Sequence, residues 1–166
     1  MKISGFSFVK NGVKLYFPVA ESIRSILPIC DEFIVAVGKG DEDDTTRETI
    51  TAIGDPKVKI IDTDWDQYRQ EYHGQINAIQ TNIALDACSG DWCFYLQADE
   101  VLHEKYLTVT ENRARGLLDD REVEGLLFRY KHFWGDYRHY HYSHGWYGRE
   151  IRIVRNNIGV RSHLSA

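Results

Sequence analysis

The fold is decided by the stretch GDWCFYLQADE, residues 90–100. The apolar run within 91–96 is short and bounded by polar residues, which is typical of a strand buried on both faces of a parallel sheet. Three polar side chains, Gln97, Asp99 and Glu100, follow this run almost at once. Because ligands bind at the carboxyl ends of strands in such sheets, Asp99 is predicted to be a functional residue rather than a solvated loop acid.

Around this stretch, strand and helix patterns alternate along the chain. The expected strands span 3–9, 33–37, 57–62, 91–96, 124–130 and 150–155, and the expected helices span 13–27, 47–53, 76–87 and 103–118. This alternation predicts an α/β fold with a mainly parallel central sheet and helices on both faces. The 166 residues, 43% of them hydrophobic, supply enough apolar material for a single domain over 1–166.

The charge is unevenly distributed along the chain. The net charge is −5, with 12 Lys/Arg against 21 Asp/Glu in residues 1–120 and 8 against 4 in residues 121–166. A general nucleic-acid binder needs a basic surface that displaces counterions from phosphates, so the acidic first part argues against nucleic acid as a partner. The basic last part remains suited to a smaller anion.

Cysteine usage and hydropathy indicate the compartment. Cys30, Cys88 and Cys93 form neither an even set for disulfides nor a paired metal-binding pattern, which predicts buried free thiols in a reducing compartment. The first apolar run is too short for a signal peptide, and no segment approaches the ~18 apolar residues of a membrane span. The sequence therefore predicts a cytoplasmic protein without a transmembrane segment.

Acidic residues follow three of the expected strands. They are Asp41 to Asp44 after the second strand, Asp62 and Asp64 after the third, and Asp99 after the fourth. These acids would converge on one edge of a parallel sheet, where Mg²⁺ or Mn²⁺ binds one or two carboxylates together with phosphate oxygens of a substrate. The edge therefore predicts a metal-bound phosphate ligand, although the loop acids 41–43 taken singly fit solvated residues better.

Other phosphate-binding and hydrolase motifs do not occur in the sequence. Gly38-Lys39-Gly40 lacks the third glycine of a dinucleotide fingerprint, and no P-loop motif is present. No serine lies in a G-x-S-x-G elbow. A nicotinamide cofactor, a P-loop nucleotide and covalent hydrolase chemistry are therefore disfavoured.

Taken in order, four segments resemble the nucleotide-binding half of the family 2 glycosyltransferases, which use nucleotide-sugars and have the GT-A fold. They are ISGFSFVKNG (3–12), FIVAVGKGDEDDTTRETI (33–50), QINAIQTNIALDACSGDW (75–92) and CFYLQADE (93–100). The last is the most specific, because it is similar to the strand that leads into the D-x-D motif of that family. The resemblance implies a donor-binding half over 1–120 and the start of an acceptor side over 121–166.

The resemblance also implies an activity and a metal. A glycosyl group, such as a hexosyl group, would pass from a UDP- or GDP-sugar, held with Mn²⁺ or Mg²⁺, to a hydroxyl of a saccharide or lipid-linked acceptor. Asp99 matches the metal-binding acid of the motif, and Gln97 stands where its first acid is usual. An amide still bonds a ribose hydroxyl but carries no charge, so metal affinity is expected to rest on Asp99 and Glu100.

Further site residues follow from the same resemblance. Asp44 matches the aspartate that contacts the nucleoside, and Val9 and Asn11 would lie near the base. His163 is similar to a late histidine that some members use as an additional metal ligand. Among the downstream acids, Glu150 is predicted to be the general base that takes the acceptor proton, and the alternative for it is an ion pair with Arg149 or Arg152.

An aromatic stretch, HFWGDYRHYHYSHGWYG at 132–148, shows no clear periodicity. His139 and His141 alternate as strand ligands would, but no tight ligand set completes them, so an aromatic loop is favoured over a metal site. Aromatic faces suit sugar rings, which predicts that this loop covers the acceptor.

Two other functions remain open from the sequence. A catalytically incomplete nucleotide-binding module, such as a truncated member of the family, would keep the sheet and Asp99 but lack the base. A phospho-accepting aspartate domain would also end a strand in Asp. That class predicts a pair of acids after the first strand, and FVKNGVK (8–14) contains none.

Overall fold

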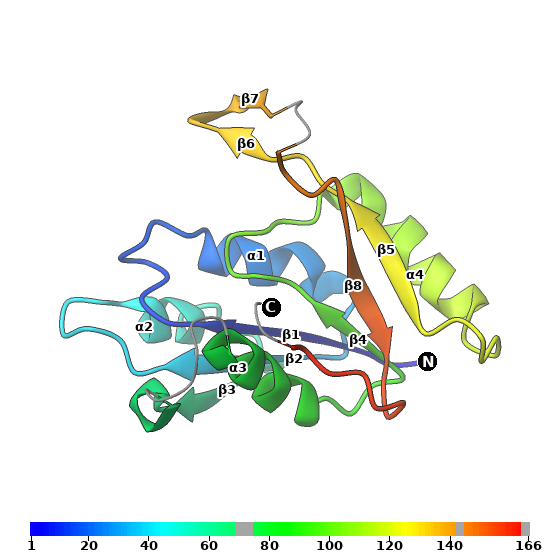
Figure 1. Ribbon diagram of the computed structural model, residues 1–166, viewed down its shortest axis with the longest axis horizontal. Coiled ribbons are helices and arrows are strands. Elements are labelled where there is room, and N and C mark those ends of the chain that lie inside the picture. Colours follow the sequence, from blue (N-terminus) through cyan, green and yellow to red (C-terminus); the bar gives the residue numbers. More distant parts are fainter. Residues whose placement is uncertain (69–74, 142–144, 164–166) are drawn as a thin grey trace.

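The computed structural model describes residues 1–68, 75–141 and 145–163, and six strands form its main sheet, in the order β3-β2-β1-β4-β8-β5 (Figure 1). These strands are β1 (Ile3–Val9), β2 (Glu32–Gly38), β3 (Val58–Thr63), β4 (Trp92–Tyr95), β5 (Gly125–Arg129) and β8 (Arg149–Arg155). β1 to β4 run parallel, whereas β8 is antiparallel to both of its neighbours. The predicted α/β fold with a mainly parallel sheet is confirmed.

Helices cover both faces of this sheet. They are α1 (Val19–Ile26), α2 (Thr46–Thr51), α3 (Gln75–Asp86) and α4 (Leu107–Gly116), with the 3-10 turns η1 (Leu27–Ile29), η2 (Trp65–Tyr68) and η3 (Glu104–Tyr106). α3 packs Ala84 and Leu85 against Phe6 and Tyr95 on one face. α1, α2 and α4 cover the opposite face, where Phe94 lies. Within the described ranges, no helix has the length and hydropathy that crossing a bilayer requires.

The central strands show why their sequences do not alternate. Every residue of β2 is buried, since helices cover the strand on both sides. Each side chain of FIVAV therefore enters one of two cores, whichever way it points.

Two elements differ from the prediction. The first helix begins at Val19 rather than near residue 13, because Pro18 precedes it and the residue before a proline is forced out of the helical region. The aromatic stretch contains a small hairpin, β6 (Phe133–Trp134) and β7 (Asp136–Tyr140), where only a loop was expected. Gly135 allows its turn with φ +75°. Figure 1 shows this hairpin standing apart from the main sheet.

A buried carboxylate joins the amino-terminal ends of the strands. Glu32 is 7% exposed, and it accepts hydrogen bonds from Ser4 Oγ at 2.8 Å, Ser89 N at 2.8 Å, Ser89 Oγ at 2.7 Å and Lys59 Nζ at 2.6 Å. Burial opposes ionisation most strongly, but the bonds from Lys59, Ser89 and Ser4 together lower the pKa of Glu32 to about 2. One side chain therefore links β1, β2, β3 and the turn before β4.

We expect Glu32→Gln to reduce the acid sensitivity of the fold. The depressed pKa of Glu32 means that its charge stabilises the protein above pH 4.5, the ordinary value, and that this contribution is lost as the pH falls toward 2. The charge-dependent part is on the order of 3 kcal/mol. Urea unfolding between pH 7 and 3 should show a flatter dependence in the variant than in the wild type, while Glu104→Gln, at an exposed position, should leave the wild-type slope unchanged. Identical slopes in all three proteins would contradict this role.

Candidate functional site

The carboxyl ends of β1 to β4 meet at one edge of the sheet, where β8 also begins. Most of the predicted site residues lie in segments at this edge: Val9, Asn11, Asp44, Gln97, Asp99, Glu100 and Glu150. Val9 itself is 3% exposed and belongs to the core, so only its backbone faces the edge.

Asn11 and Asp44 join the loops that follow β1 and β2. Asn11 has a positive φ of 56°, and its Oδ1 accepts a hydrogen bond from Asp41 N at 2.8 Å. The carboxylate of Asp44 accepts bonds from Thr46 N at 3.2 Å and Thr46 Oγ1 at 2.8 Å. A Cβ at Gly40 would lie 2.7 Å from Asp44 Oδ2 and 2.9 Å from Asn11 Oδ1, so glycine is required where the two side chains meet. Both residues therefore fix the shape of the edge.

A hollow, called the first hollow below, lies at the ends of β2 and β3. Its volume is about 530 Å³, which is in the range of small-molecule sites, and its lining includes Gly38, Asp44 and Asp64. On its rim, the guanidinium of Arg47 donates two hydrogen bonds to the carboxylate of Asp62, at 2.7 and 2.9 Å. These hydrogen bonds are the main reason why the pKa of Asp62 lies below its ordinary value.

The acidic loop after β2 also has its own cation. Lys14 Nζ contacts Asp41 Oδ2 and Asp43 Oδ1, each at 2.7 Å, and these hydrogen bonds lower the pKa values of both acids. Lys14 therefore offsets the charge of two of the acids that converge on this edge. Over the described parts of the chain, no three His, Cys, Asp or Glu side chains are close enough to hold a metal ion by themselves.

The motif after β4 is a closed turn. Glu100 N donates to Gln97 O at 3.0 Å, and Glu100 Oε2 accepts from Gln97 N at 3.2 Å. Arg152 also holds this turn, because its Nε donates to Glu100 Oε2 at 2.9 Å and its Nη2 donates to Glu100 Oε1 at 2.8 Å. Glu100 is thus held by an almost fully buried, bidentate ion pair, with side-chain exposures of 7% for Arg152 and 10% for Glu100. Asp99 lies inside the turn that this ion pair fixes.

Arg152 is the main functional residue that sequence reasoning missed. Its guanidinium lies 5.3 Å from the ring centre of Tyr95 and 5.2 Å from that of Tyr130. The available signal was an arginine inside the apolar strand sequence EIRIVR, because a buried arginine needs a carboxylate partner. Which of the chain's acids is the partner becomes visible only in three dimensions.

Asp99 differs from the other acids of the edge. Its side chain is exposed to the crevice, and no ion pair neutralises it within the described residues. The surrounding protein raises the pKa of Asp99, first by removing water and then through the neighbouring charge of Glu100. A cation is the partner that would relieve this cost, and phosphate oxygens of a substrate would complete the shell of that cation.

The two remaining predicted residues lie further apart. Glu150 is half-buried near the start of β8, opposite Phe128, and has no ion pair with either arginine proposed for it in the described structure. His163 is exposed on a tail that crosses α3, where Ser162 and Asn82 exchange hydrogen bonds of 2.9 and 3.0 Å. The structure therefore places Glu150 at the edge and leaves His163 outside any cluster of candidate ligands among the described residues.

Comparison with known proteins shows the fold. Neither a protein-family model nor a curated protein sequence matches the chain. It is similar to the crystal structure of Staphylococcus aureus TarS 1-349 in complex with UDP-GlcNAc, with TM-score 0.56 and 21% identity over 82% of this chain and 36% of that one. It is also similar to Mycobacterium tuberculosis glucosyl-3-phosphoglycerate synthase, with TM-score 0.51 and 20% identity over 77% and 43% of the two chains.

A complex of the second protein with Mn²⁺, UDP and glucosyl-3-phosphoglycerate matches with TM-score 0.50 and 19% identity over 77% and 43% of the two chains. At these identities the likeness shows a shared fold. The chain spans between 36% and 43% of the length of these structures.

Proposed function

We propose that this chain, whose fold is the GT-A fold expected from its sequence, is the nucleotide-sugar-binding domain of a family 2 glycosyltransferase. It would move a sugar from a nucleoside-diphosphate donor to an acceptor hydroxyl. The observation that carries the proposal is the closed turn, which presents an unneutralised Asp99 at the ligand edge of the sheet. The structural neighbours in complex with UDP and UDP-GlcNAc support the donor class.

The donor would occupy the edge from the first hollow to the Asp99 turn. Asn11 and Asp44 would shape the nucleoside site by holding the loops after β1 and β2 together, with the backbone of Val9 beneath the base. The Gln97 amide would face the ribose of a UDP- or GDP-sugar. A hollow of about 530 Å³ accommodates a ligand of nucleoside size.

Asp99 fits the role of the principal ligand for Mn²⁺ or Mg²⁺, because these ions bind one or two carboxylates and complete their shell with phosphate oxygens and water. The ion would offset charge that develops on the nucleoside-diphosphate leaving group. Glu100 and His163 remain predicted ligands. Both oxygens of Glu100 already accept bonds from Arg152, so its clearest contribution is to hold Asp99 in place.

Glu150 is the proposed general base. Its carboxylate lies at the start of β8, on the acceptor side of the edge, where it would take the proton of an acceptor hydroxyl as the oxygen attacks the sugar. The acceptor would be a saccharide or a lipid-linked molecule held by residues 121–166, with donor binding in residues 1–120 of the same domain. We place the activity in the cytoplasm, in keeping with three buried, unpaired cysteines.

The second candidate is a catalytically incomplete module that binds the donor without transferring its sugar. This candidate is supported by the coverage of the structural neighbours, since the chain spans 36% and 43% of the length of two of them. One experiment separates the two: thermal stability is measured with UDP- and GDP-sugars, with and without Mn²⁺, alongside release of the free nucleoside diphosphate. A shift together with release supports the transferase, and a shift without release or transfer supports the module. No shift with any donor would rule out both.

The raised pKa of Asp99 predicts an unusual pH dependence of metal binding. Because the metal binds the ionised carboxylate, lowering the pH should abolish the Mn²⁺-dependent part of the thermal shift at a higher pH than an aspartate of ordinary pKa 3.8 would. The metal-independent shift serves as the control and should persist over the same range. A metal-dependent shift that stays constant down to the pH at which the protein itself unfolds would contradict this assignment.

A further inference from the structure

A second hollow, larger than the first, is a groove between α4 and β5 that reaches the Asp99 turn. Its volume is about 1150 Å³, above the usual size of a small-molecule site. One face of α4 forms a wall through Tyr106, Val109, Arg113 and Leu117, which follow one another at helical spacing. The opposite wall is β5 with the segments before and after the β6–β7 hairpin.

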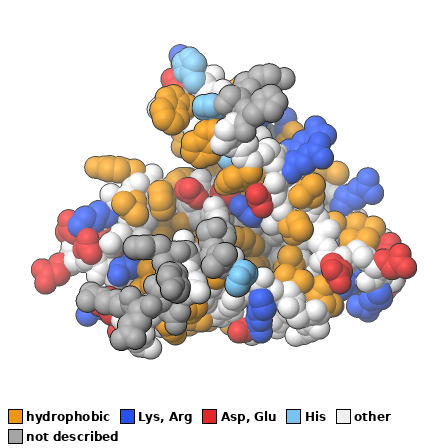
Figure 2. Space-filling view, in the orientation of Figure 1, with side chains coloured by type: hydrophobic (Ala, Val, Ile, Leu, Met, Phe, Trp, Pro, Cys, Tyr) orange, Lys and Arg blue, Asp and Glu red, His pale blue; other side chains and the backbone are white. Residues whose placement is uncertain are grey.

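The groove is apolar and exposed. Among its lining residues, Val109 is 51% exposed, Leu127 58% and Trp134 68%. Figure 2 shows hydrophobic side chains gathered on the hairpin and on the surface beneath it. Contiguous exposed apolar surface of this extent marks a binding site more often than an ordinary surface.

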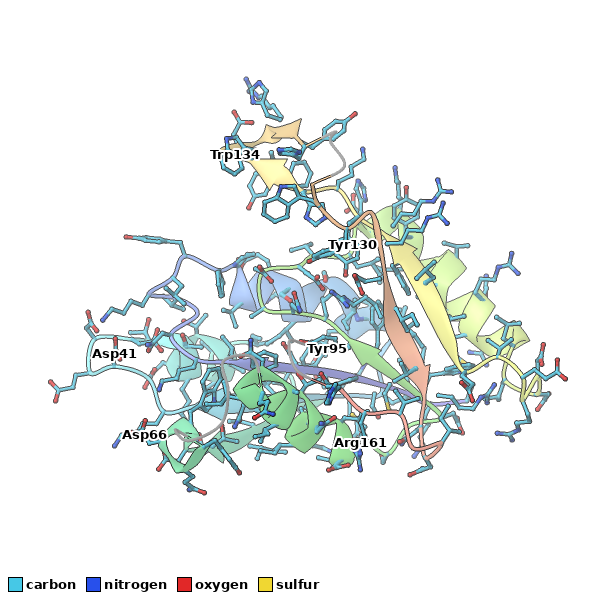
Figure 3. The ribbon with its side chains drawn as sticks, viewed as in Figure 1. Asp41, Asp66, Tyr95, Tyr130, Trp134 and Arg161 are labelled. Atoms are coloured by element: carbon cyan, nitrogen blue, oxygen red, sulfur yellow. The ribbon has the colours of Figure 1, made fainter. Side chains whose placement is uncertain are left out.

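A chain of aromatic rings connects the groove with the Asp99 turn. Tyr130 stacks on His132 with ring centres 5.7 Å apart, and His132 lies 5.2 Å from Trp146. Tyr130 also covers the guanidinium of Arg152, which holds Glu100. In Figure 3, Tyr95, Tyr130 and Trp134 lie in succession from the sheet toward the hairpin. The groove therefore opens directly beside the residue proposed to hold the donor metal.

Four cations of the groove lack acidic partners among the described residues. Lys105, Arg113, Arg129 and Lys131 line it, and none of them forms an ion pair with a described carboxylate. The acids that line it are Asp99 and Glu100, and Arg152 already neutralises the second. An apolar groove with unpaired positive charge is complementary to a ligand that is both apolar and anionic.

Most of these charges are also placed at one end. Lys105 precedes α4, Arg129 is the last residue of β5 and Lys131 follows it, so these three lie toward the end of the groove that meets the Asp99 turn. Leu117 and Leu126 lie toward the other end, where α4 stops and β5 starts. Three of the four unpaired cations therefore lie near the proposed reaction centre, whereas Arg113, in the last turn of α4, lies with these aliphatic residues, the aliphatic floor of the groove, toward the other end.

We propose that this groove binds the acceptor as a lipid phosphate, with the phosphate at Lys105, Arg129 and Lys131 and the hydrocarbon chain along Val109 and the aliphatic floor. The inference rests on the proposed function, because it names the acceptor class of that function, and it adds Lys105 and α4 to the acceptor-binding residues proposed within 121–166. A free saccharide would leave the aliphatic floor exposed, and a neutral lipid would leave the three cations without a partner.

Monododecyl phosphate, used below its micelle concentration and without nucleotide, tests the binding site. Trp134 and Trp146 line the groove, so binding should change the tryptophan fluorescence. We expect monododecyl phosphate to bind at least about tenfold more tightly than neutral dodecyl maltoside or cationic dodecyltrimethylammonium. Inorganic phosphate should give no signal at the same concentrations. Equal binding of the three amphiphiles, or binding of inorganic phosphate alone, would overturn the proposal.

Three variants locate the ligand. Arg129→Gln/Lys131→Gln should remove the preference for the phosphate while dodecyl maltoside still binds weakly, and Val109→Glu should weaken every amphiphile. Arg121→Gln removes an exposed arginine outside the groove and should bind as the wild type does. Sedimentation velocity checks a competing occupant, since a dimer that Val109→Glu abolishes would mean that a second copy of the chain covers this face. That result would overturn the lipid assignment.

The outcome is independent of donor binding. If monododecyl phosphate binds and no nucleotide-sugar does, the groove is a lipid-phosphate site and the proposed transferase fails. If nucleotide-sugars bind and the lipid phosphate does not, the transferase stands and the acceptor assignment is wrong.

Discussion

Asp99→Asn should abolish the Mn²⁺-dependent part of UDP-sugar binding and lower any transfer activity about 100-fold or more. The substitution keeps the size of the side chain but removes the only carboxylate of the closed turn that lacks a cationic partner among the described residues. Since phosphate oxygens cannot hold the ion alone at the sheet edge, the metal should lose its anchor. Thermal shift with UDP-sugar at several Mn²⁺ concentrations measures the first effect, and nucleotide release measures the second.

Asp119→Asn is the matched control, because it makes the same chemical change at an exposed position of the turn after α4. It should retain the full metal-dependent shift. The metal-independent shift should survive in both variants, since neither substitution touches the proposed nucleoside site at Asn11 and Asp44. An unchanged metal dependence in Asp99→Asn would refute the metal assignment and leave the nucleotide site standing.

Arg152→Met should cost about 3–5 kcal/mol of unfolding free energy, because it leaves the buried carboxylate of Glu100 without its partner. For a chain of this size the melting temperature should fall by roughly 10 °C. Donor binding should weaken as well, since the turn that carries Asp99 loses its tie to β8. Urea unfolding and UDP-sugar binding in the presence of Mn²⁺ measure the two effects separately.

Two further variants show whether the unpaired charge is the cause. Glu100→Gln/Arg152→Met removes the buried charge and should regain more than half of the lost stability without regaining metal-dependent binding. Arg149→Met, at an exposed position of the same strand, should behave as the wild type in both assays. If the double variant were no more stable than Arg152→Met, lost packing rather than an uncompensated charge would be responsible.

The sheet and the position of Asp99 were predictable because both depend on local sequence. β-branched and aromatic runs of four to seven residues define the parallel strands, and polar side chains after them mark the ligand edge. Asp99 therefore followed from the fold class and one short stretch. The late start of α1 also has a visible cause in the sequence, because Pro18 keeps the residue before it out of the helical region, although the apolar spacing alone predicts a helix from residue 13.

The remaining features depend on contacts between distant residues. Glu100 and Arg152 are 52 positions apart, and nothing in either local sequence distinguishes this pair from other acids and arginines. The acidic loop after β2 is neutralised by Lys14, 27 positions before Asp41. The groove was hidden for the same reason, because one wall comes from α4 and the other from β5 and the segments that flank the β6–β7 hairpin.

The position of β8 in the sheet has a consequence for the order in which the protein forms. β8 is the last strand in the sequence but lies inside the sheet, between β4 and β5. During synthesis, β1 to β4 can assemble while β5 has no strand to pair with, since β8 is its only partner in the described sheet. The arrival of β8 then pairs β5 and brings Arg152 to Glu100 in one step. The parallel part of the sheet is thus complete in its backbone before the chain acquires the contact that sets the Asp99 turn.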